Sequence, residues 1–201
     1  MTRVKICGMS RQEDLEFALS LGADEFGFIL EPTSPRRIEA VPAWLPLEVE
    51  AYAVFGPLPS PLPEIGKLGI QFIPDWSSPL PNIEGRKVRP VLRPKPDTDW
   101  IQVRDRLQEA GITELVMDPY HPDAFGGTGK TLDDDAVEKA QGLLNVKLVI
   151  AGGLTPENVA DVIERHHPFG VDVASGLESA PGIKDREKVR RFLREAGKIP
   201  A

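Results

Sequence analysis

Cys7 is the single cysteine in 201 residues, and it ends the run Val4-Lys5-Ile6-Cys7 just before Gly8. A thiol at the end of a strand can exchange a proton. Lys5 lies two residues earlier, on the same face of an extended chain, and its cation would favour the thiolate. Taken alone, a lone cysteine is more often a small buried hydrophobe, and a buried lysine is as often an ion-pair partner. The run therefore marks a candidate proton-transfer site whose role stays open.

Asp118 follows the apolar run 115–117, and a carboxylate in that position is either paired or ready to donate a proton. The loop after it, Pro119 to Leu132, contains Phe125-Gly126-Gly127-Thr128-Gly129-Lys130-Thr131. A phosphate-binding P-loop would need glycine where Ala124 stands, so we exclude nucleotide hydrolysis. We expect a mobile glycine-rich lid beside the site, with a plain surface loop as the alternative.

Two glycine-bearing segments, at Gly152-Gly153 and at Ser175-Gly176, each follow an apolar run. Backbone N–H groups in such segments bind phosphate at the last two strands of many α/β barrels. The alternative to phosphate binding is that these glycines only form tight turns. Arg36 and Arg37 follow the second apolar run, and one of them could hold a carboxylate through two hydrogen bonds, although exposed arginines are commonly just solvated.

Composition excludes several classes of protein. A net charge of −7 argues against nucleic acid as a partner, while a small phosphate can still bind locally. One cysteine rules out an internal disulfide, and the three histidines form no zinc-site spacing. Neither a signal-peptide core nor a membrane-spanning apolar run is present, so we expect a cytoplasmic protein without a membrane partner.

The elements that must position these residues alternate between two patterns. Helical patterns with start signals include one opened by Ser10 with Glu13, one opened by Thr155-Pro156, and the segments 99–110, 134–144 and 184–196. Short runs typical of buried strands are Val4–Cys7, Glu25–Leu30, Glu50–Phe55, Gly69–Ile73, Lys87–Leu92, Glu114–Asp118, Lys147–Ala151 and Gly170–Ala174. Strands alternating with helices predict parallel pairing with right-handed crossovers.

The strand count predicts a single-domain (β/α)8 barrel over residues 1–201, with an open doubly wound sheet as the alternative. The chain is short for eight full units. Half of its 20 prolines fall between Pro57 and Pro96, where ordinary helix cannot form. We therefore expect the helices of units three and four to be shortened or lost. The carboxyl ends of the strands would carry the site, and Glu31 and Arg93 also lie there.

These motifs together resemble the phosphoribosylanthranilate isomerase family of tryptophan biosynthesis. The resemblance covers roughly residues 1–38 and 114–195, and it is weak in the residues between these two ranges. At the fourth strand the family's Gln-Leu-His-Gly is replaced by Gln71-Phe72-Ile73-Pro74, which leaves the role of that strand open. The matching segments, in the family's order, are Lys5-Ile6-Cys7-Gly8, Ser34-Pro35-Arg36, Asp118 with Gly126 to Thr131, Ala151-Gly152-Gly153-Leu154 with Pro156 to Asn158, and Val171 to Gly176 with Glu178, Pro181, Gly182 and Lys184.

The resemblance implies an Amadori rearrangement of N-(5-phosphoribosyl)anthranilate without metal or redox cofactor. By resemblance Cys7 is the general base, Asp118 the general acid, and Arg36 the partner of the anthranilate carboxylate. The phosphate would lie against Gly152, Gly153, Ser175 and Gly176, with Gly127 in the lid. Asp172 would either contact the substrate or orient Lys5. The family likeness leaves monomer and homodimer open.

Two other functions stay open at this point. A histidine-pathway barrel performs the same rearrangement on a larger substrate, but its first strand carries an acidic residue where Cys7 stands. A phosphate-binding barrel without catalysis would fit the altered fourth strand and the proline-rich middle. Loss of phosphoribosylanthranilate fluorescence on adding the protein would separate these possibilities.

Overall fold

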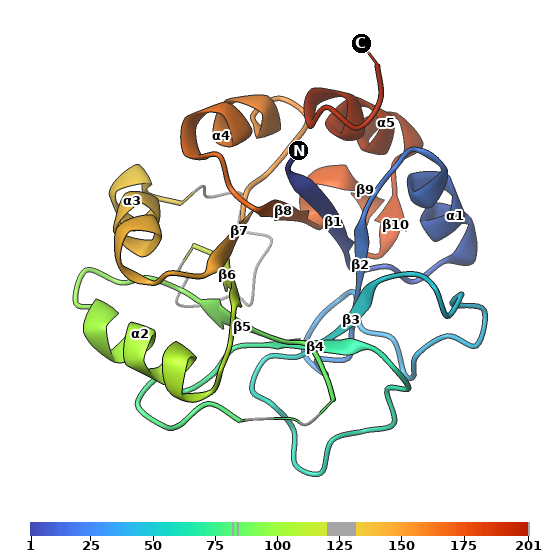
Figure 1. The fold of residues 1–201 in the computed structure, drawn as a ribbon. Coiled ribbons are helices and arrows are strands. Elements are labelled where there is room, and N and C mark those ends of the chain that lie inside the picture. The colour runs from blue at the N-terminus through green and yellow to red at the C-terminus, as the bar shows by residue number, and fades with distance from the viewer. Residues whose placement is uncertain (82, 84, 120–131, 201) are drawn as a thin grey trace.

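The computed structural model describes residues 1–81, 83, 85–119 and 132–200. Eight parallel strands form a closed barrel in chain order, and the eighth pairs with the first (Figure 1). The predicted (β/α)8 architecture is confirmed, and the open sheet is wrong. The strands are β1 (Arg3–Cys7), β2 (Glu25–Ile29), β3 (Ala51–Val54), β4 (Gly69–Phe72), β5 (Val88–Leu92), β6 (Glu114–Met117), β7 (Lys147–Ala151) and β8 (Gly170–Val173).

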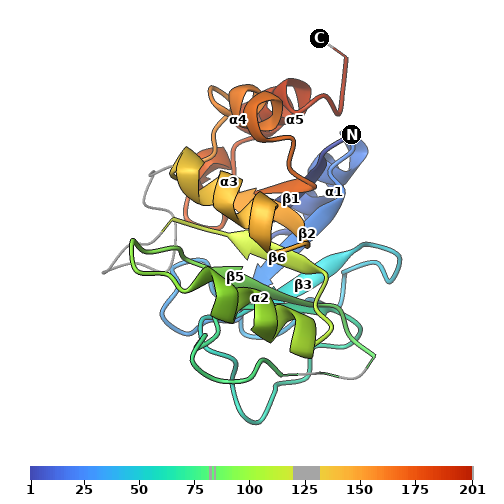
Figure 2. The ribbon, with the colours of Figure 1, turned by 60° about the vertical axis from the view of Figure 1, so that its left-hand side comes forward.

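Helices cover the outside of the barrel beside β1 and β5 to β8 (Figure 2). Their buried faces pack on the strands through apolar clusters, in which Leu107 and Phe192 are fully buried. A short 3-10 helix, η1 (Ser175–Leu177), and an antiparallel pair, β9 (Glu178–Ala180) and β10 (Ile183–Lys184), follow β8. The helices are α1 (Gln12–Ser20), α2 (Trp100–Glu109), α3 (Asp134–Leu143), α4 (Val159–His166) and α5 (Arg186–Glu195).

In their described residues, three consecutive connections lack a helix, one more than the sequence predicted. The segments 55–68 and, in its described part, 73–87 contain none, as expected for units three and four. The segment 30–50, in unit two, contains none either, which corrects the expectation for that unit. Four prolines fall within that segment, at 32, 35, 42 and 46, and each interrupts helical hydrogen bonding.

Two predicted helix starts are wrong. Helix α1 begins at Gln12 after Arg11, with no side-chain cap, because the Ser10 hydroxyl donates instead to the carbonyl of Gly182 at 2.6 Å. Helix α4 begins at Val159, after a turn in which the Thr155 hydroxyl accepts from the Glu157 N–H at 3.2 Å. Ser10 does not cap α1 because its hydroxyl makes a tertiary hydrogen bond, and Thr155 caps the turn that precedes α4.

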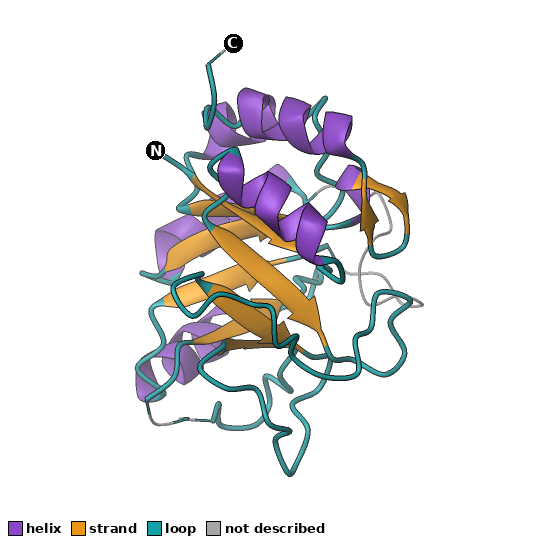
Figure 3. Cartoon of the chain, turned by 90° about the vertical axis from the view of Figure 1, so that its right-hand side faces the viewer, coloured by secondary structure: helices purple, strands orange, loops and turns teal. Residues whose placement is uncertain are grey.

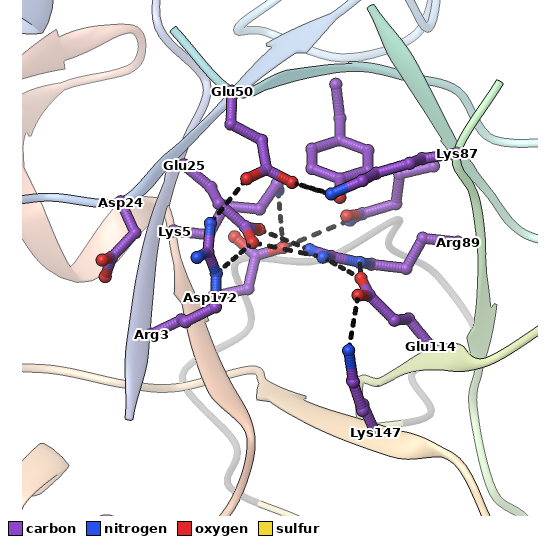
Figure 4. Close-up of polar contacts among 12 residues, drawn as sticks. Arg3, Lys5, Asp24, Glu25, Glu50, Lys87, Arg89, Glu114, Lys147 and Asp172 are labelled. Carbon is purple, nitrogen blue, oxygen red and sulfur yellow. Dashed lines mark hydrogen bonds and ion pairs between the residues drawn. The ribbon is translucent and has the colours of Figure 1, made fainter. Parts of the chain in front are cut away.

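The inside of the barrel is charged at the amino ends of the strands. Arg89, 1% exposed, donates to Glu25 at 2.6 Å and to Glu114, and its guanidinium stacks 4.3 Å from the centre of the Tyr52 ring. Arg3 pairs with Glu25 at 2.7 Å (Figure 4). We call Arg3, Glu25, Glu50, Lys87, Arg89 and Glu114 the barrel-floor network. Above it, valines at 91, 116 and 149 fill the interior and support the opposite end.

Candidate active site

A cavity opens at the carboxyl ends of the strands, the end at which the arrowheads lie in Figure 3. Every described residue that the sequence predicted for the site lines it: Cys7, Arg36, Asp118, Gly152, Gly153, Asp172, Ser175 and Gly176. Glu31 and Arg93 line it as well. Gly127 and the rest of the predicted lid over 120–131 lie outside the described residues.

Cys7 lies at the end of β1 with 7% of its surface exposed, and its register partner on β2 is Gly27. A Cβ atom at Gly27 would lie 2.6 Å from Cys7 Sγ and 2.9 Å from Lys5 Nζ. Only glycine therefore leaves room for the thiol and the ammonium group side by side. Gly27 was not among the residues predicted for the site, although a glycine within a buried strand is a known signal of close approach.

The protonation of Cys7 is set by opposing effects. Burial raises the pKa of its thiol, Lys5 opposes that shift, and the Asp172 carboxylate adds to it, so the net pKa lies above the ordinary value. Burial lowers the pKa of Lys5, but Asp172 and Cys7 together raise it by more, so the net pKa of Lys5 lies above its usual range and Lys5 stays charged. Cys7 therefore holds its proton at neutral pH in the empty cavity.

Asp172 links β8 to β1 and β4 inside the cavity. Its Oδ2 accepts from Lys5 Nζ at 2.7 Å and from Gln71 Nε2 at 3.2 Å. The orientation of Lys5, one of the two roles open for Asp172, is therefore present in the structure. Among the described residues, the buried oxygens Asp172 Oδ1 and Gln71 Oε1 have no hydrogen-bond partner, and both residues line the cavity.

Asp118 follows β6, and its carboxylate pairs with Arg93, whose Nη2 lies 2.9 Å from Oδ2. Burial raises the pKa of Asp118, Arg93 lowers it, and Asp172 adds to the increase, so the net pKa lies above the ordinary value. Gly152, with φ of +86°, lets this segment approach, because a Cβ there would lie 1.9 Å from Pro119 Cδ and 3.1 Å from Asp118 Oδ1. A carboxyl group with a raised pKa can act as a proton donor.

Arg36 reaches the cavity from the loop after β2, past Gly8, where a Cβ would lie 2.9 Å from Arg36 Cδ. Its Nε and Nη2 bind Glu178 at 2.9 and 2.8 Å. Lys184 Nζ also binds Glu178, at 3.0 Å, and donates to the carbonyl of Cys7 at 2.7 Å. Glu178 and Lys184 thus tie the β9–β10 pair to both Arg36 and the end of β1. Arg37, the other candidate, is exposed and pairs with Glu39.

The walls of the cavity differ in chemistry. Gly152, Gly153, Ser175 and Gly176, after β7 and β8, form a backbone-rich wall, and a Cβ at Gly176 would lie 1.9 Å from the Leu154 carbonyl oxygen. The ends of β2 to β5 supply an apolar wall of Ile29, Val54, Phe55, Ile73 and Val91. The fourth strand, whose role was open, contributes Ile73 to this wall and Gln71 to the Asp172 contact.

The part of the chain that the structure describes contains neither a metal-binding cluster nor a membrane-spanning helix. No group of three or more His, Cys, Asp or Glu side chains could hold a metal ion. None of the helices in this part of the chain has the length and apolar character needed to cross a membrane.

The closed parallel barrel, with a cavity at its carboxyl ends that has a backbone-rich wall and an apolar wall, defines a (β/α)8-barrel protein whose pocket suits a small anionic ligand. A family model described as N-(5'phosphoribosyl)anthranilate (PRA) isomerase matches residues 84–195, more than half of the chain. The chain belongs to this family, and its activity is the isomerase step of tryptophan biosynthesis.

Individual relatives agree over nearly the whole chain. An N-(5'-phosphoribosyl)anthranilate isomerase of Acinetobacter calcoaceticus is 34% identical, with 96% of this chain and 95% of that protein covered. The crystal structure of the Thermotoga maritima enzyme is 27% identical over 99% of this chain and 100% of that one, with a TM-score of 0.74. A further solved isomerase, 25% identical with a TM-score of 0.69 over 99% and 100% of the two chains, is a complex with reduced 1-(o-carboxyphenylamino)-1-deoxyribulose 5-phosphate.

Proposed function

We propose that this chain converts N-(5'-phosphoribosyl)anthranilate to 1-(2-carboxyphenylamino)-1-deoxyribulose 5-phosphate, with Cys7 and Asp118 transferring the protons. Asp118 gives its proton to the ribose ring oxygen while the C1′–O bond breaks and the nitrogen lone pair forms the C=N bond of a Schiff base. Cys7 then removes the C2′ proton, the electron pair of that C–H bond forms the C1′=C2′ bond of an enolamine, and the π electrons of the C=N bond return to nitrogen. The enolamine tautomerises to the aminoketone.

The observation that carries this proposal is that one cavity contains both proton-transfer groups between two chemically different walls. The glycine segments after β7 and β8 would hold the phosphate through backbone N–H groups. The apolar wall of β2 to β5 would hold the aromatic ring, with Arg36 at its carboxylate. Asp172 has an oxygen available for the substrate and also orients Lys5.

The protonation states explain which form of the protein reacts. The reaction needs a protonated Asp118 and an ionised Cys7, a pair that carries one proton in total. Burial above all raises the pKa of each group. Since a thiol ordinarily has a pKa of about 8.5 and an aspartate about 3.9, the proton rests mainly on Cys7. The reacting form has that proton on Asp118, and its population does not change with pH between the two pKa values.

The direct test is the loss of phosphoribosylanthranilate fluorescence with the purified protein. Replacing Cys7→Ala or Asp118→Asn should each lower kcat by at least ~10², the usual worth of a positioned acid or base. Far-ultraviolet circular dichroism would check that both variants fold. A near-normal rate in a folded variant would remove that residue from the scheme. No turnover by the unaltered protein, with product still bound, would favour the non-catalytic barrel.

The partner expected in this scheme is a small phosphorylated molecule, without nucleic acid, and the reaction as written uses neither a metal nor a redox cofactor. A cytoplasmic location and a monomeric or homodimeric state stay predictions. Fractionation of cells and sedimentation of the purified protein would test them.

A further inference from the structure

Two arginines line the cavity, and each is paired with a carboxylate of a different kind. Arg36 binds Glu178, which Lys184 also holds, so that pair belongs to a framework with a second cation. Arg93 binds Asp118, the proposed general acid, and both of these side chains are 13% exposed. Of the two arginines, Arg93 is therefore the one that pairs with a proposed catalytic residue.

The Arg93 ion pair opposes the proposed role of its partner. A guanidinium 2.9 Å from Asp118 stabilises the carboxylate, which has no proton to donate. Among the described residues, the charged groups that face Asp118 are Arg93, at the end of β5, and Asp172, on β8. Asp172 favours the protonated acid and Arg93 disfavours it, so moving Arg93 away would release the donor.

The proposed substrate supplies another partner for Arg93. With its phosphate at the glycine segments of β7 and β8, the aromatic ring would lie on the apolar wall formed by β2 to β5. This wall runs from Ile29, at the end of β2 before the Arg36 loop, to Val91, two residues before Arg93. A ring carboxylate at the β5 end of the wall would lie beside Arg93. A carboxylate accepts two parallel hydrogen bonds from a guanidinium, the strongest geometry for this pair.

We propose that Arg93 exchanges partners during the reaction: it holds Asp118 in the empty cavity and turns to the ring carboxylate of the bound substrate, which frees Asp118 to donate its proton. No covalent bond changes in this step, since one ion pair replaces another. The exchange rests on the proposed function. It adds Arg93 to Arg36 as a determinant for substrates that carry an aromatic carboxylate.

The test compares Arg93→Met with the unaltered protein in the pH dependence of kcat/KM and of kcat. The first profile reports the free protein and the second the substrate complex. Because the reacting form carries one proton, the acidic limb of each profile follows Asp118. Arg93→Met should raise KM at least tenfold and move the acidic limb of kcat/KM to higher pH. The acidic limb of kcat should stay in place, because Arg93 has already left Asp118 in the complex.

Three results would overturn the exchange. KM within twofold of the original value would mean that Arg93 does not reach the substrate. Equal movement of the limb in both profiles would mean that Arg93 never leaves Asp118. An unchanged acidic limb in both pH profiles would mean that the Arg93–Asp118 ion pair has no influence on the pKa of Asp118.

Two variants and one substrate sharpen the comparison. Arg104→Met removes a surface cation of α2 that pairs with Asp105, and should leave both profiles unchanged. Arg93→Lys keeps the charge and should restore the limb of kcat/KM while recovering KM only in part, because an ammonium cannot bind both carboxylate oxygens in parallel. A phosphoribosyl amine without the ring carboxylate should bind the unaltered and Arg93→Met proteins alike. Lack of turnover by the unaltered protein would instead contradict the proposed function itself.

Discussion

Cys7, Lys5, Asp172 and Gln71 lie next to one another at the barrel mouth, and Asp172 influences the charge of both Lys5 and Cys7. The Asp172 carboxylate holds Lys5 as a cation and at the same time disfavours ionisation of Cys7. Lys5 acts in the opposite direction on the thiol. A base that keeps its proton in the empty cavity is therefore a consequence of three side chains and their burial, with no single dominant partner.

At this scale the pH dependence can be predicted. Below the pKa of Asp118 both groups are protonated and no thiolate forms; above the pKa of Cys7 neither holds a proton and the acid is missing. We expect kcat/KM to be flat through neutral pH, with an alkaline limb above the ordinary thiol pKa of about 8.5 and an acidic limb above the ordinary aspartate pKa of about 3.9. Steady-state rates over the full pH range measure it. An alkaline limb below the ordinary thiol value would mean that burial does not dominate at Cys7.

The helices that remain have well-defined starts, and α2 illustrates how they contribute. Asp99 precedes α2, and its Oδ1 accepts from the backbone N–H groups of Ile101 and Gln102 at 3.1 and 3.0 Å. Helix α2 packs Val103 and Leu107 against the outside of the barrel. Since the three preceding connections lack helices, this helix resumes the outer layer after β5.

Asp99→Ala should therefore lower the free energy of unfolding by about 1 kcal/mol, the usual worth of an N-cap carboxylate. Urea denaturation followed by circular dichroism measures the change. The control is Asp97→Ala, which removes an exposed carboxylate two residues earlier and should change stability by less than about 0.5 kcal/mol. Equal effects of the two substitutions would show that general surface charge, and not the cap, is responsible.

On the scale of the whole molecule, the barrel separates two functions at its two ends. The carboxyl end holds the cavity and the proposed proton-transfer groups, Cys7 and Asp118. The amino end is closed by the barrel-floor network, in which Glu25 lies between Arg3 and Arg89 (Figure 4). The valine layer between them keeps the charged floor out of the cavity.

Arg89→Met should lower the free energy of unfolding by roughly 3–5 kcal/mol, because it leaves the buried carboxylate of Glu25 without its main partner. Urea denaturation measures the loss. Lys87→Met removes an exposed cation that pairs with Glu50 in the same network, and we expect a change of about 0–1 kcal/mol. A small effect of Arg89→Met would indicate that Arg3 alone neutralises Glu25.

The sequence by itself determined the order of elements and the end of the barrel at which the cavity lies. Apolar runs ending in Cys7, Asp118 and Gly152 are local patterns, and parallel strands bring such ends to one rim. The proline positions also predicted the loss of two helices. Prolines in the segment 30–50 exclude a third helix. This loss was not predicted, because four spaced prolines are a weaker local signal than the dense cluster after Pro57.

Only the tertiary structure decided the partners of these residues. Gly27 beside Cys7, Gln71 on Asp172, Glu178 on Arg36 and Arg93 on Asp118 join segments far apart in the chain or on different strands. Likewise, Ser10 does not form the predicted helix cap, because its hydroxyl donates a hydrogen bond to the carbonyl of Gly182. A hydrogen bond or ion pair between distant residues depends on how the barrel closes, and closure is a property of all eight strands together. Charge and burial follow from that closure, so the protonation of Cys7 and Asp118 could not be read from their local sequence.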